Sequence, residues 1–423
     1  MRDVIVVGAG GGGPVAAKEL AARGLDVLLL EGGPRYQHPE REWSHLENDA
    51  NNPVTGFLRV GSSDRSRGAW LRELPQNSFL WQVAGVGGTT LHYYGNSPRA
   101  YPGVFNDYSG RDRDSYDRAH QFPFGYCDLV PYYEWVEATL PVQTAPMGTK
   151  EETFLTGAGR LGLPVQTTKD TTQASYRPQE NAILQPSGTA GLTDDPARLT
   201  FPQAQGCTFC GFCFQGCYEP RGAPRNLAAK RSTDNSYVPM ALTADAWQRG
   251  GKAVTLIADA YVTRIDTSGG GDTAAGVTWR DNASGQTHSE TAKVVVLAGG
   301  CVENPRLWLN SSLPNPNDWV GRGFTDHHFD FVTGEFPFYT GSSKGSGSSA
   351  RCDFPGIGGL ENVGLPPAIQ AFGATFSDAG MAGLYDNGAP VDSAGADTVG
   401  RLVGNQLRSL LGNGIDRLLN VLV

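Results

Sequence analysis

The stretch Val4-Ile5-Val6-Val7-Gly8-Ala9-Gly10-Gly11-Gly12-Gly13 decides the fold, because an apolar run there enters a turn made of glycines. Residues 14–26 continue with apolar side chains at near-helical spacing, so one face of this segment is apolar. A second apolar run, Val27-Leu28-Leu29-Leu30, ends on Glu31. The order strand, glycine turn, helix, strand and acid predicts a β-α-β unit that binds a dinucleotide.

Each conspicuous residue of this unit has an expected task. Gly8 would permit the tight turn, Gly10 would let the backbone approach a pyrophosphate, and Gly13 would let helix and strand pack closely. Glu31 follows at about the 20-residue offset at which an acid accepts the ribose hydroxyls. An acid in this place disfavours the 2′-phosphate of NADP, whereas the motif alone leaves both NAD and FAD open.

Length and composition exclude several classes of protein. The chain has 423 residues, of which 39% are hydrophobic and 18% charged, enough for a large core or two connected domains. Its net charge of −9 argues against a nucleic-acid partner. No apolar run reaches the roughly 18 residues of a transmembrane segment, and the chain starts on its first strand without a signal pattern. We therefore expect a cytoplasmic protein, periplasmic or membrane-associated only if a partner carries it.

A second segment rich in glycines and hydroxyl groups is WQVAGVGGTTLHYYGNSPR, residues 81–99. Its backbone N–H groups and small side chains can approach a phosphate or a flat ring closely. We expect Gly87, Gly88, Thr89 and Thr90 to belong to the cofactor site.

The glycine turn, its continuation to Gly33 and the Gly87–Thr90 segment together resemble the glucose-methanol-choline (GMC) family of FAD-dependent oxidoreductases. Later segments agree with the same family, namely residues 129–133, 229–239, 294–307 and 320–327. The resemblance runs from Met1 to about residue 340, and it implies that the dinucleotide is FAD.

The resemblance also implies the fold class and the domains. The expected class is α/β, with a Rossmann-like FAD-binding domain and a discontinuous α+β substrate domain. The FAD-binding domain would be assembled from residues 1–100 and 205–335, and the substrate or cap domain from residues 101–204 and 336–423.

Local patterns predict further elements. Tyr132 to Leu140 is amphipathic and predicts a helix, and residues 251–299 alternate as in a β-meander. Residues 341–350 are almost all Gly, Ser and Ala, which predicts a flexible loop or lid. An apolar-patterned helix is expected from Leu402 to Leu422.

Four of the seven cysteines lie close together in the pattern C-x2-C-x2-C-x3-C, which is clustering for a metal rather than a disulfide framework. They are Cys207, Cys210, Cys213 and Cys217. Their spacing brings thiolates onto one iron–sulfur cluster. Sugar and polyol dehydrogenases of the GMC family are similar, with a three-iron cluster on a C-x5-C-x3-C pattern that Cys207, Cys213 and Cys217 fit.

We therefore expect a 3Fe-4S or 4Fe-4S cluster on these cysteines. Two alternatives stay open. Sterol-oxidising relatives carry a similar cysteine pattern without a cluster, and the cysteines could also be structural or bind zinc.

His92 occupies the place where some members of the family join histidine covalently to the flavin, whereas others have no such link. The resemblance also places Asn96 and Ser97 beside the flavin ring. A hydrogen-bonding or core histidine is the alternative for His92.

The resemblance implies oxidation of an alcohol, in which a base takes the hydroxyl proton as hydride leaves the carbinol carbon for the flavin N5. The family's base is a histidine in the C-terminal portion, and no histidine follows His328 here. His327 and His328 fall in the motif that closes the cofactor domain. We therefore expect a C-terminally truncated sequence with no catalytic base of its own.

Three functions remain at this stage. The first is an FAD-dependent dehydrogenase of a sugar or polyol that passes electrons through an iron–sulfur cluster to an external acceptor, such as a partner protein or a small subunit. The second is an oxidase of a sterol or other apolar alcohol without a cluster. The third is an inactive FAD-binding fragment.

Overall fold

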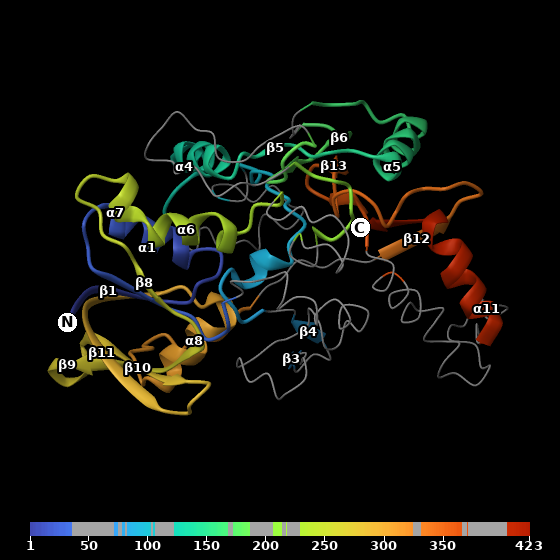
Figure 1. The fold of residues 1–423 in the computed structure, drawn as a ribbon. Coiled ribbons are helices and arrows are strands. Elements are labelled where there is room, and N and C mark those ends of the chain that lie inside the picture. Colours follow the sequence, from blue (N-terminus) through green and yellow to red (C-terminus); the bar gives the residue numbers. More distant parts are fainter. Residues whose placement is uncertain are drawn as a thin grey trace. The chain divides into compact units, whose positions relative to one another are not determined.

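The structure is a computed structural model of the chain. The residues that it describes are 1–35, 72–74, 78–80, 83–102, 105, 122–167, 172–186, 206–213, 217, 229–324, 331–365, 370 and 404–423. They fall into two compact units (Figure 1). The first unit draws on Met1–Tyr93 and Gln215–His328, and the second on Tyr94–Gly188, Gln205–Phe214 and Phe329–Val423.

The first unit is built from strands, α-helices and short 3-10 turns. Its strands are β1 (Arg2–Val7), β2 (Val27–Leu30), β3 (Arg72–Leu74), β4 (Ser78–Leu80), β8 (Thr255–Ile257), β9 (Ala260–Ser268), β10 (Thr273–Asp281) and β11 (Thr287–Leu297). Its helices are α1 (Gly13–Ala22), α6 (Tyr237–Leu242), α7 (Ala244–Trp247) and α8 (Gly300–Asn310), with short 3-10 turns η1 (Gly88–Leu91), η4 (Thr233–Asn235) and η5 (Gly269–Gly271).

A six-stranded sheet in the order β8-β2-β1-β11-β10-β9 forms the centre of this unit. Strand β1 pairs in parallel with β2 on one side and with β11 on the other, and β2 pairs in parallel with β8. The predicted strand, turn, helix and strand over the first thirty residues are therefore present, and the fold is mixed α/β.

Strand β11 changes partners along its length. Its first half pairs antiparallel with β10, from Thr287 to Thr291, and its second half pairs in parallel with β1, from Ala292 to Leu297. Because β10 also pairs antiparallel with β9, these strands form the meander predicted for residues 251–299 (Figure 1).

Both faces of the central strands are buried, as expected for parallel strands. Val4, Val6 and Leu29 face a cluster that includes Ala17 of α1 and Val238 of α6. The alternate residues of β1 and β2 face a second cluster with the meander and α8, which contains Ile5, Val7, Leu28, Leu30, Val277 and Leu307. Because successive side chains of a strand point to opposite faces, one sheet contributes to two apolar clusters, one on each face.

The second unit has helices at its margin and a second sheet. Its helices are α4 (Tyr126–Thr139), α5 (Thr149–Arg160) and α11 (Gly404–Ser409), the last followed by a π-helical turn η6 (Leu410–Gly414) and a 3-10 turn η7 (Ile415–Arg417). Its strands are β5 (Gln143–Thr144), β6 (Ser175–Pro178), β7 (Glu180–Asn181), β12 (Phe331–Glu335), β13 (Ala350–Phe354), β14 (Gly358–Val363) and β15 (Leu418–Leu422). Helix α4 includes the helix predicted from Tyr132 and begins six residues earlier.

A five-stranded sheet in the order β12-β15-β14-β13-β6 dominates this unit. Helix α5 packs on it through Phe154 and Ala158, against Ala350, Cys352 and Leu419. All the pairings are antiparallel.

The predicted helix from Leu402 to Leu422 is wrong in its second half. Helix α11 ends at Ser409, and Leu418–Leu422 form strand β15. The reason is tertiary, because β15 lies between β12 and β14 and pairs with both. An apolar run of this length suits a buried strand as well as a helix, so neighbouring strands decide.

The predicted flexible lid at residues 341–350 is also wrong. Most of this segment is buried, and its serine side chains bond to distant parts of the same unit. Ser342 Oγ donates to the carbonyl of Ile415 at 3.0 Å, and Ser349 Oγ donates to the carbonyl of Pro146 at 3.0 Å. The serine hydroxyls are therefore bonded to buried protein groups and not to water, which the polar composition of the segment did not predict.

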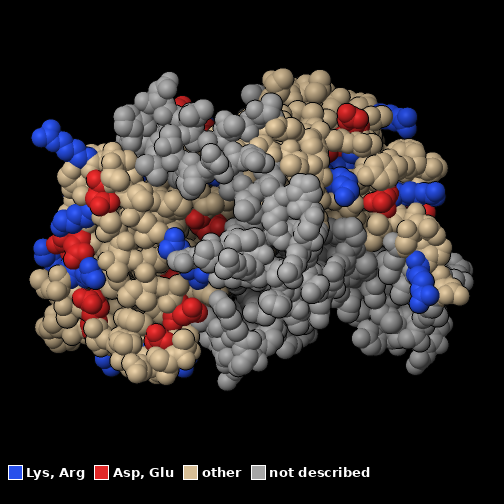
Figure 2. Space-filling model, in the orientation of Figure 1, with Lys and Arg blue, Asp and Glu red and all other residues tan. Residues whose placement is uncertain are grey.

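Within the described part of the chain, no helix has the length and apolar character that crossing a membrane requires. Charged side chains of both signs are interspersed on the face drawn in Figure 2. Ion pairs of the first unit include Arg2–Asp26 and Lys293–Asp3.

Candidate functional site

The glycine turn between β1 and α1 is the first part of the candidate cofactor site. Gly8 has a φ of +104°, and a Cβ there would lie 2.5 Å from the carbonyl oxygen of Ala298. A Cβ on Gly13 would lie 1.8 Å from the carbonyl oxygen of Gly8. The turn therefore closes tightly on α1 and β11 because these positions lack side chains.

The outer part of the same turn is open. Gly11 and Gly12 are exposed, and a Cβ on Gly12 would meet nothing within 4 Å. Gly12 caps α1 without a side-chain hydrogen bond, so the first backbone amides of this helix are not capped by a side chain. A helix start with open space before it suits a diphosphate.

The Gly85–His92 segment, distant in sequence, packs directly on the turn. Gly87 N donates to Ala9 O at 2.8 Å, and a Cβ on Gly88 would lie 2.6 Å from the Cα of Gly10. Two glycine segments thus meet backbone to backbone, which side chains would prevent.

A third segment, Lys230–Thr233, ties the first two together. Thr233 Oγ1 donates to Gly10 O at 3.0 Å and lies 3.1 Å from Thr90 Oγ1. Thr90 Oγ1 in turn donates to Gly87 O at 2.6 Å and accepts from Thr233 N at 3.1 Å. Three stretches of the first unit therefore converge around the start of α1.

Lys230 fixes the other end of the second segment. Its side chain is fully buried, and its ammonium donates to the carbonyls of Leu91 and Tyr93, both at 2.8 Å. The same ammonium lies 5.0 Å from the centre of the Tyr93 ring. Three carbonyl groups, counting Thr90 O at 3.4 Å, thus surround a buried cation at the end of η1.

Glu31 lies at the end of β2 with its carboxylate almost fully buried. Its oxygens accept backbone hydrogen bonds from Ala9 at 2.8 Å, Gly33 at 2.8 Å and Gly85 at 3.0 Å. Burial raises the pKa of Glu31, and the three amides act in the opposite direction. The carboxylate therefore joins the glycine turn to the second glycine segment.

The predicted site residues of the second glycine segment differ in their exposure to solvent. Thr89 is exposed, whereas His92 is buried where η1 ends and its backbone amide donates to Thr89 O at 3.1 Å. Asn96 belongs to the second unit, so it is described there. His327 and His328 lie outside the described residues.

Sequence reasoning missed the roles of Lys230, Thr233 and Asp234. Asp234 is close to Gly87, where a Cβ would lie 3.0 Å from that of Asp234. Burial raises the pKa of Asp234, and it lowers the pKa of Arg231 to about 10. The signal in the sequence was the family-like segment 229–239, which is dense in charged and hydroxyl residues from Lys230 to Asp234.

The predicted metal centre is not assembled among the described residues. Within them, no three Cys, His, Asp or Glu side chains come close enough to hold a metal ion. No disulfide joins any of the seven cysteines, all of which the structure describes. The side chains of Cys207 and Cys213 instead pack with Ile183 in a small apolar cluster of the second unit.

Two of these sulfurs do accept backbone amides. Phe209 N donates to Cys207 Sγ at 3.4 Å in the second unit, with Phe209 itself at a φ of +60°. Lys230 N donates to Cys217 Sγ at 3.4 Å in the first unit.

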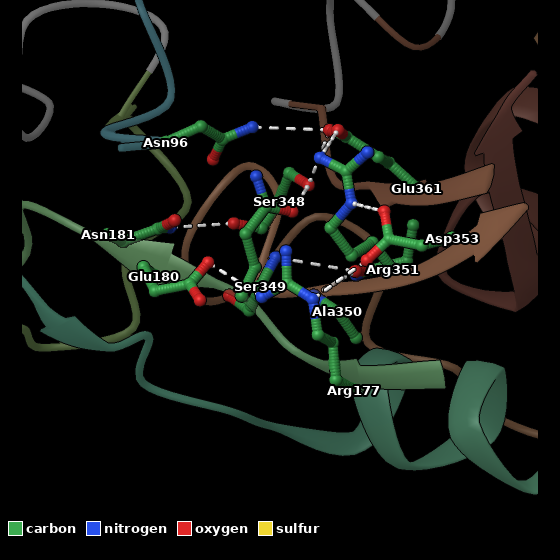
Figure 3. A network of polar contacts seen from close by, with 12 residues as sticks. Asn96, Arg177, Glu180, Asn181, Ser348, Ser349, Ala350, Arg351, Asp353 and Glu361 are labelled. Atoms are coloured by element: carbon green, nitrogen blue, oxygen red, sulfur yellow. Dashed lines mark hydrogen bonds and ion pairs between the residues drawn. The ribbon is translucent and has the colours of Figure 1, made fainter. Parts of the chain in front are cut away.

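The second unit contains a buried network of charged and amide side chains (Figure 3). Arg177 is fully buried and donates to Asp353 at 2.8 Å and to Glu180 at 2.6 Å. Arg351 donates to Asp353 at 2.6 Å and to Glu361 at 2.8 Å. Burial alone would raise the pKa of Asp353, but Arg351 and Arg177 hold it below its ordinary value.

Asn96 joins this network, since its Nδ2 donates to Glu361 Oε2 at 3.2 Å. Ser348 Oγ reaches the same carboxylate oxygen at 3.1 Å. Figure 3 shows Asn96, Ser348 and Arg351 meeting at Glu361.

Comparison with known proteins agrees with the geometry of the first unit. Residues 3–44 match the model of an FAD binding domain, and residues 171–329 match the model described as GMC oxidoreductase. Over residues 171–329 the chain is therefore similar to GMC oxidoreductases. The open helix start and the glycine cradle of this chain fit the diphosphate of FAD.

The relatives that this chain matches are longer. 2-Methyl-1,2-propanediol dehydrogenase of Mycolicibacterium austroafricanum is 25% identical over 343 residues, which are 77% of this chain and 55% of that protein. Fructose dehydrogenase large subunit of Gluconobacter japonicus is 26% identical over 359 residues, which are 77% of this chain and 58% of that protein. The chain thus spans a little over half the length of these relatives.

Among solved structures, pyridoxine 4-oxidase from Mesorbium loti superposes with a TM-score of 0.52 at 14% identity. The match covers 86% of this chain and 66% of that structure. This likeness concerns the fold.

Proposed function

We propose that the chain is an FAD-dependent oxidoreductase that oxidises an alcohol group of a sugar or polyol and delivers the electrons to an external acceptor. The observation that carries the proposal is the convergence of three distant segments, Gly8–Gly13, Gly85–His92 and Lys230–Thr233, around the start of α1. The family match and the named dehydrogenase relatives support the reaction class.

The residues of this cradle have distinct tasks in the proposal. Gly8, Gly10 and Gly13 admit the diphosphate to the backbone amides of α1, and Gly87, Gly88, Thr89 and Thr90 bound it from the second segment. Glu31 would accept the ribose hydroxyls, and its burial would keep water away from that contact. His92 would lie at the ring end of the site.

When bound, FAD supplies the acceptor for the hydride of the carbinol carbon. The hydroxyl proton must leave at the same stage, and the proposal assigns no base to a described residue. The described histidines are His92 and His288, and the ring of His288 stacks on Trp279 at 4.3 Å in the antiparallel part of the sheet.

Two versions of electron delivery follow from the cysteines. A 3Fe-4S or 4Fe-4S cluster on Cys207, Cys210, Cys213 and Cys217 would need these sulfurs to gather on one centre, so no step is routed through it here. A second candidate is an oxidase of a sterol or other apolar alcohol without a cluster. Iron and acid-labile sulfide measured on anaerobically purified protein separate the two versions.

The proposed acceptor is a protein or a small subunit. The relative from Gluconobacter japonicus is named as a large subunit, which supports a partner subunit for this chain too. Co-purification from the native host at low ionic strength tests this part.

The central test is anaerobic reduction of bound flavin. The protein is saturated with FAD, mixed with glucitol, fructose, 1-hexanol or a sterol, and followed by the loss of flavin absorbance. We expect bleaching by the polyhydroxy compounds. A chain that binds FAD stoichiometrically but is bleached by none of these alcohols would be a cofactor-binding protein without the proposed activity.

A further inference from the structure

Asn96 and Asn181 lie directly opposite each other in the second unit and form an antiparallel bridge. Backbone hydrogen bonds flank the pair on both sides, from Ala182 N to Gly95 O at 2.7 Å and from Ser97 N to Glu180 O at 2.9 Å. The two asparagines are therefore a non-hydrogen-bonded pair, the type in which opposed side chains on one face come closest.

The hydrogen bonds of the network fix which way each carboxamide points. Asn96 Nδ2 donates to the Glu361 carboxylate at 3.2 Å, and Asn181 Nδ2 donates to the backbone carbonyl of Ser348 at 2.7 Å. Both partners can only accept, so neither amide can be turned over. The NH2 group of each side chain thus donates to an acceptor of the protein (Figure 3).

The two carboxamide oxygens are left over. Asn96 Oδ1 and Asn181 Oδ1 are buried and have no partner among the described residues. Asn181 is fully buried, and so is Gln179, whose Nε2 is also buried without a partner there. Gln179 belongs to the same place, because its Oε1 lies 3.3 Å from Ser348 Oγ.

Unpaired groups of this kind are costly unless something bonds to them. Two acceptor oxygens on neighbouring side chains repel each other, and a molecule that presents hydroxyl donors removes that repulsion. A hydroxyl can also accept from an amide donor such as Gln179 Nε2. An apolar chain can do neither.

Charge also favours neutral hydroxyl groups. Glu361 is already bonded to Arg351, Asn96 and Ser348, and Asp353 is bonded to Arg351 and Arg177. The acceptors that remain are uncharged amide oxygens, which suit hydroxyls and provide no counter-ion for an ammonium group.

We propose that Asn96 and Asn181 form a subsite for the hydroxyl groups of a polyhydroxy ligand, held in place by Glu361 and Ser348. The subsite rests on the proposed function in one respect, that the ligand is the alcohol to be oxidised. Binding itself does not depend on turnover.

The test measures binding and flavin reduction separately on the FAD-loaded chain. Ligand-observed saturation-transfer NMR with glucitol and with 1-hexanol gives a dissociation constant for each. We expect glucitol to bind more tightly, and Asn181→Ala to weaken glucitol binding about tenfold relative to 1-hexanol, the loss typical of a hydrogen bond. Asn420→Ala is the matched control, because Asn420 is a buried asparagine of β15 whose oxygen already accepts from Thr333 at 2.8 Å.

The outcomes are distinct. Preference for glucitol that Asn181→Ala reduces and Asn420→Ala keeps supports the subsite, even where no alcohol bleaches the flavin and the proposed function fails. Equal binding of glucitol and 1-hexanol by the unaltered chain overturns the subsite and assigns the two oxygens to ordered water only. That measurement needs no variant to fold.

Discussion

The carboxylate of Glu31 accepts a hydrogen bond from the backbone amide of Ala9 at 2.8 Å, although Ala9 lies in the glycine turn after β1 and Glu31 follows the end of β2. Its other oxygen accepts from Gly33 and Gly85. One buried side chain therefore holds the glycine turn, the end of β2 and the second glycine segment at fixed separations.

Because of this arrangement, we expect Glu31→Gln to lower stability although glutamine has nearly the shape of glutamate. Whichever way the new amide turns, its NH2 group faces at least one backbone N–H donor. We expect a loss of about 1–3 kcal/mol in the free energy of unfolding and weaker FAD retention. Urea unfolding and flavin content measure these effects. Glu290→Gln, at a more exposed acid of the same unit, should change neither.

The glycine turn predicts opposite results at two neighbouring positions. Gly13→Ala should destabilise the first unit by at least about 3 kcal/mol, because its Cβ would lie 1.8 Å from Gly8 O and backbone must move. Gly12→Ala meets open space and should fold like the unaltered chain. Thermal unfolding by circular dichroism separates them, and equal melting temperatures would contradict the described turn.

Lys230→Met should loosen the segment that carries His92. The substitution keeps an unbranched chain but leaves the carbonyls of Leu91 and Tyr93 without their buried donor. We expect a loss of about 2–4 kcal/mol and faster hydrogen exchange over residues 89–93. Lys252→Met, at an exposed lysine, is the control. Unchanged exchange in Lys230→Met would show that the ammonium does not hold this segment.

We expect the second unit to lose stability at acid pH because of Asp353. Although burial opposes it, the two arginines lower its pKa, so its contribution to stability is present above the ordinary aspartate value and is lost as the pH falls through the lowered one. Hydrogen exchange in β13 should therefore accelerate from about pH 4 downward. Asp353→Asn should exchange faster at pH 7 and show a flatter pH profile. Asp272→Asn, at an exposed aspartate, should keep the original profile.

The sequence predicted the β-α-β unit well because its signals are local. An apolar run, glycines at a turn and an acid after the next strand each follow from neighbouring residues. The Cys207 to Cys217 pattern was equally local, but spacing alone does not state where the sulfurs point, and Cys207 and Cys213 turn to an apolar cluster.

What the sequence could not show depends on distant partners. Ser342 and Ser349 resemble solvated loop residues until Ile415 and Pro146 supply their acceptors. Strand β15 is a strand because β12 and β14 lie beside it. Asn96 and Asn181 likewise lie opposite each other because of a bridge between distant segments, which the local sequence pattern does not predict.

The position of β1 between β2 and β11 has a consequence for biosynthesis. Strand β1 emerges from the ribosome long before its partner on one side, residues 292–297. Until then one edge of an apolar parallel pair is bare, and such edges recruit other chains. The nascent chain should therefore depend on chaperones during synthesis, and refolding from denaturant should be slow and sensitive to protein concentration.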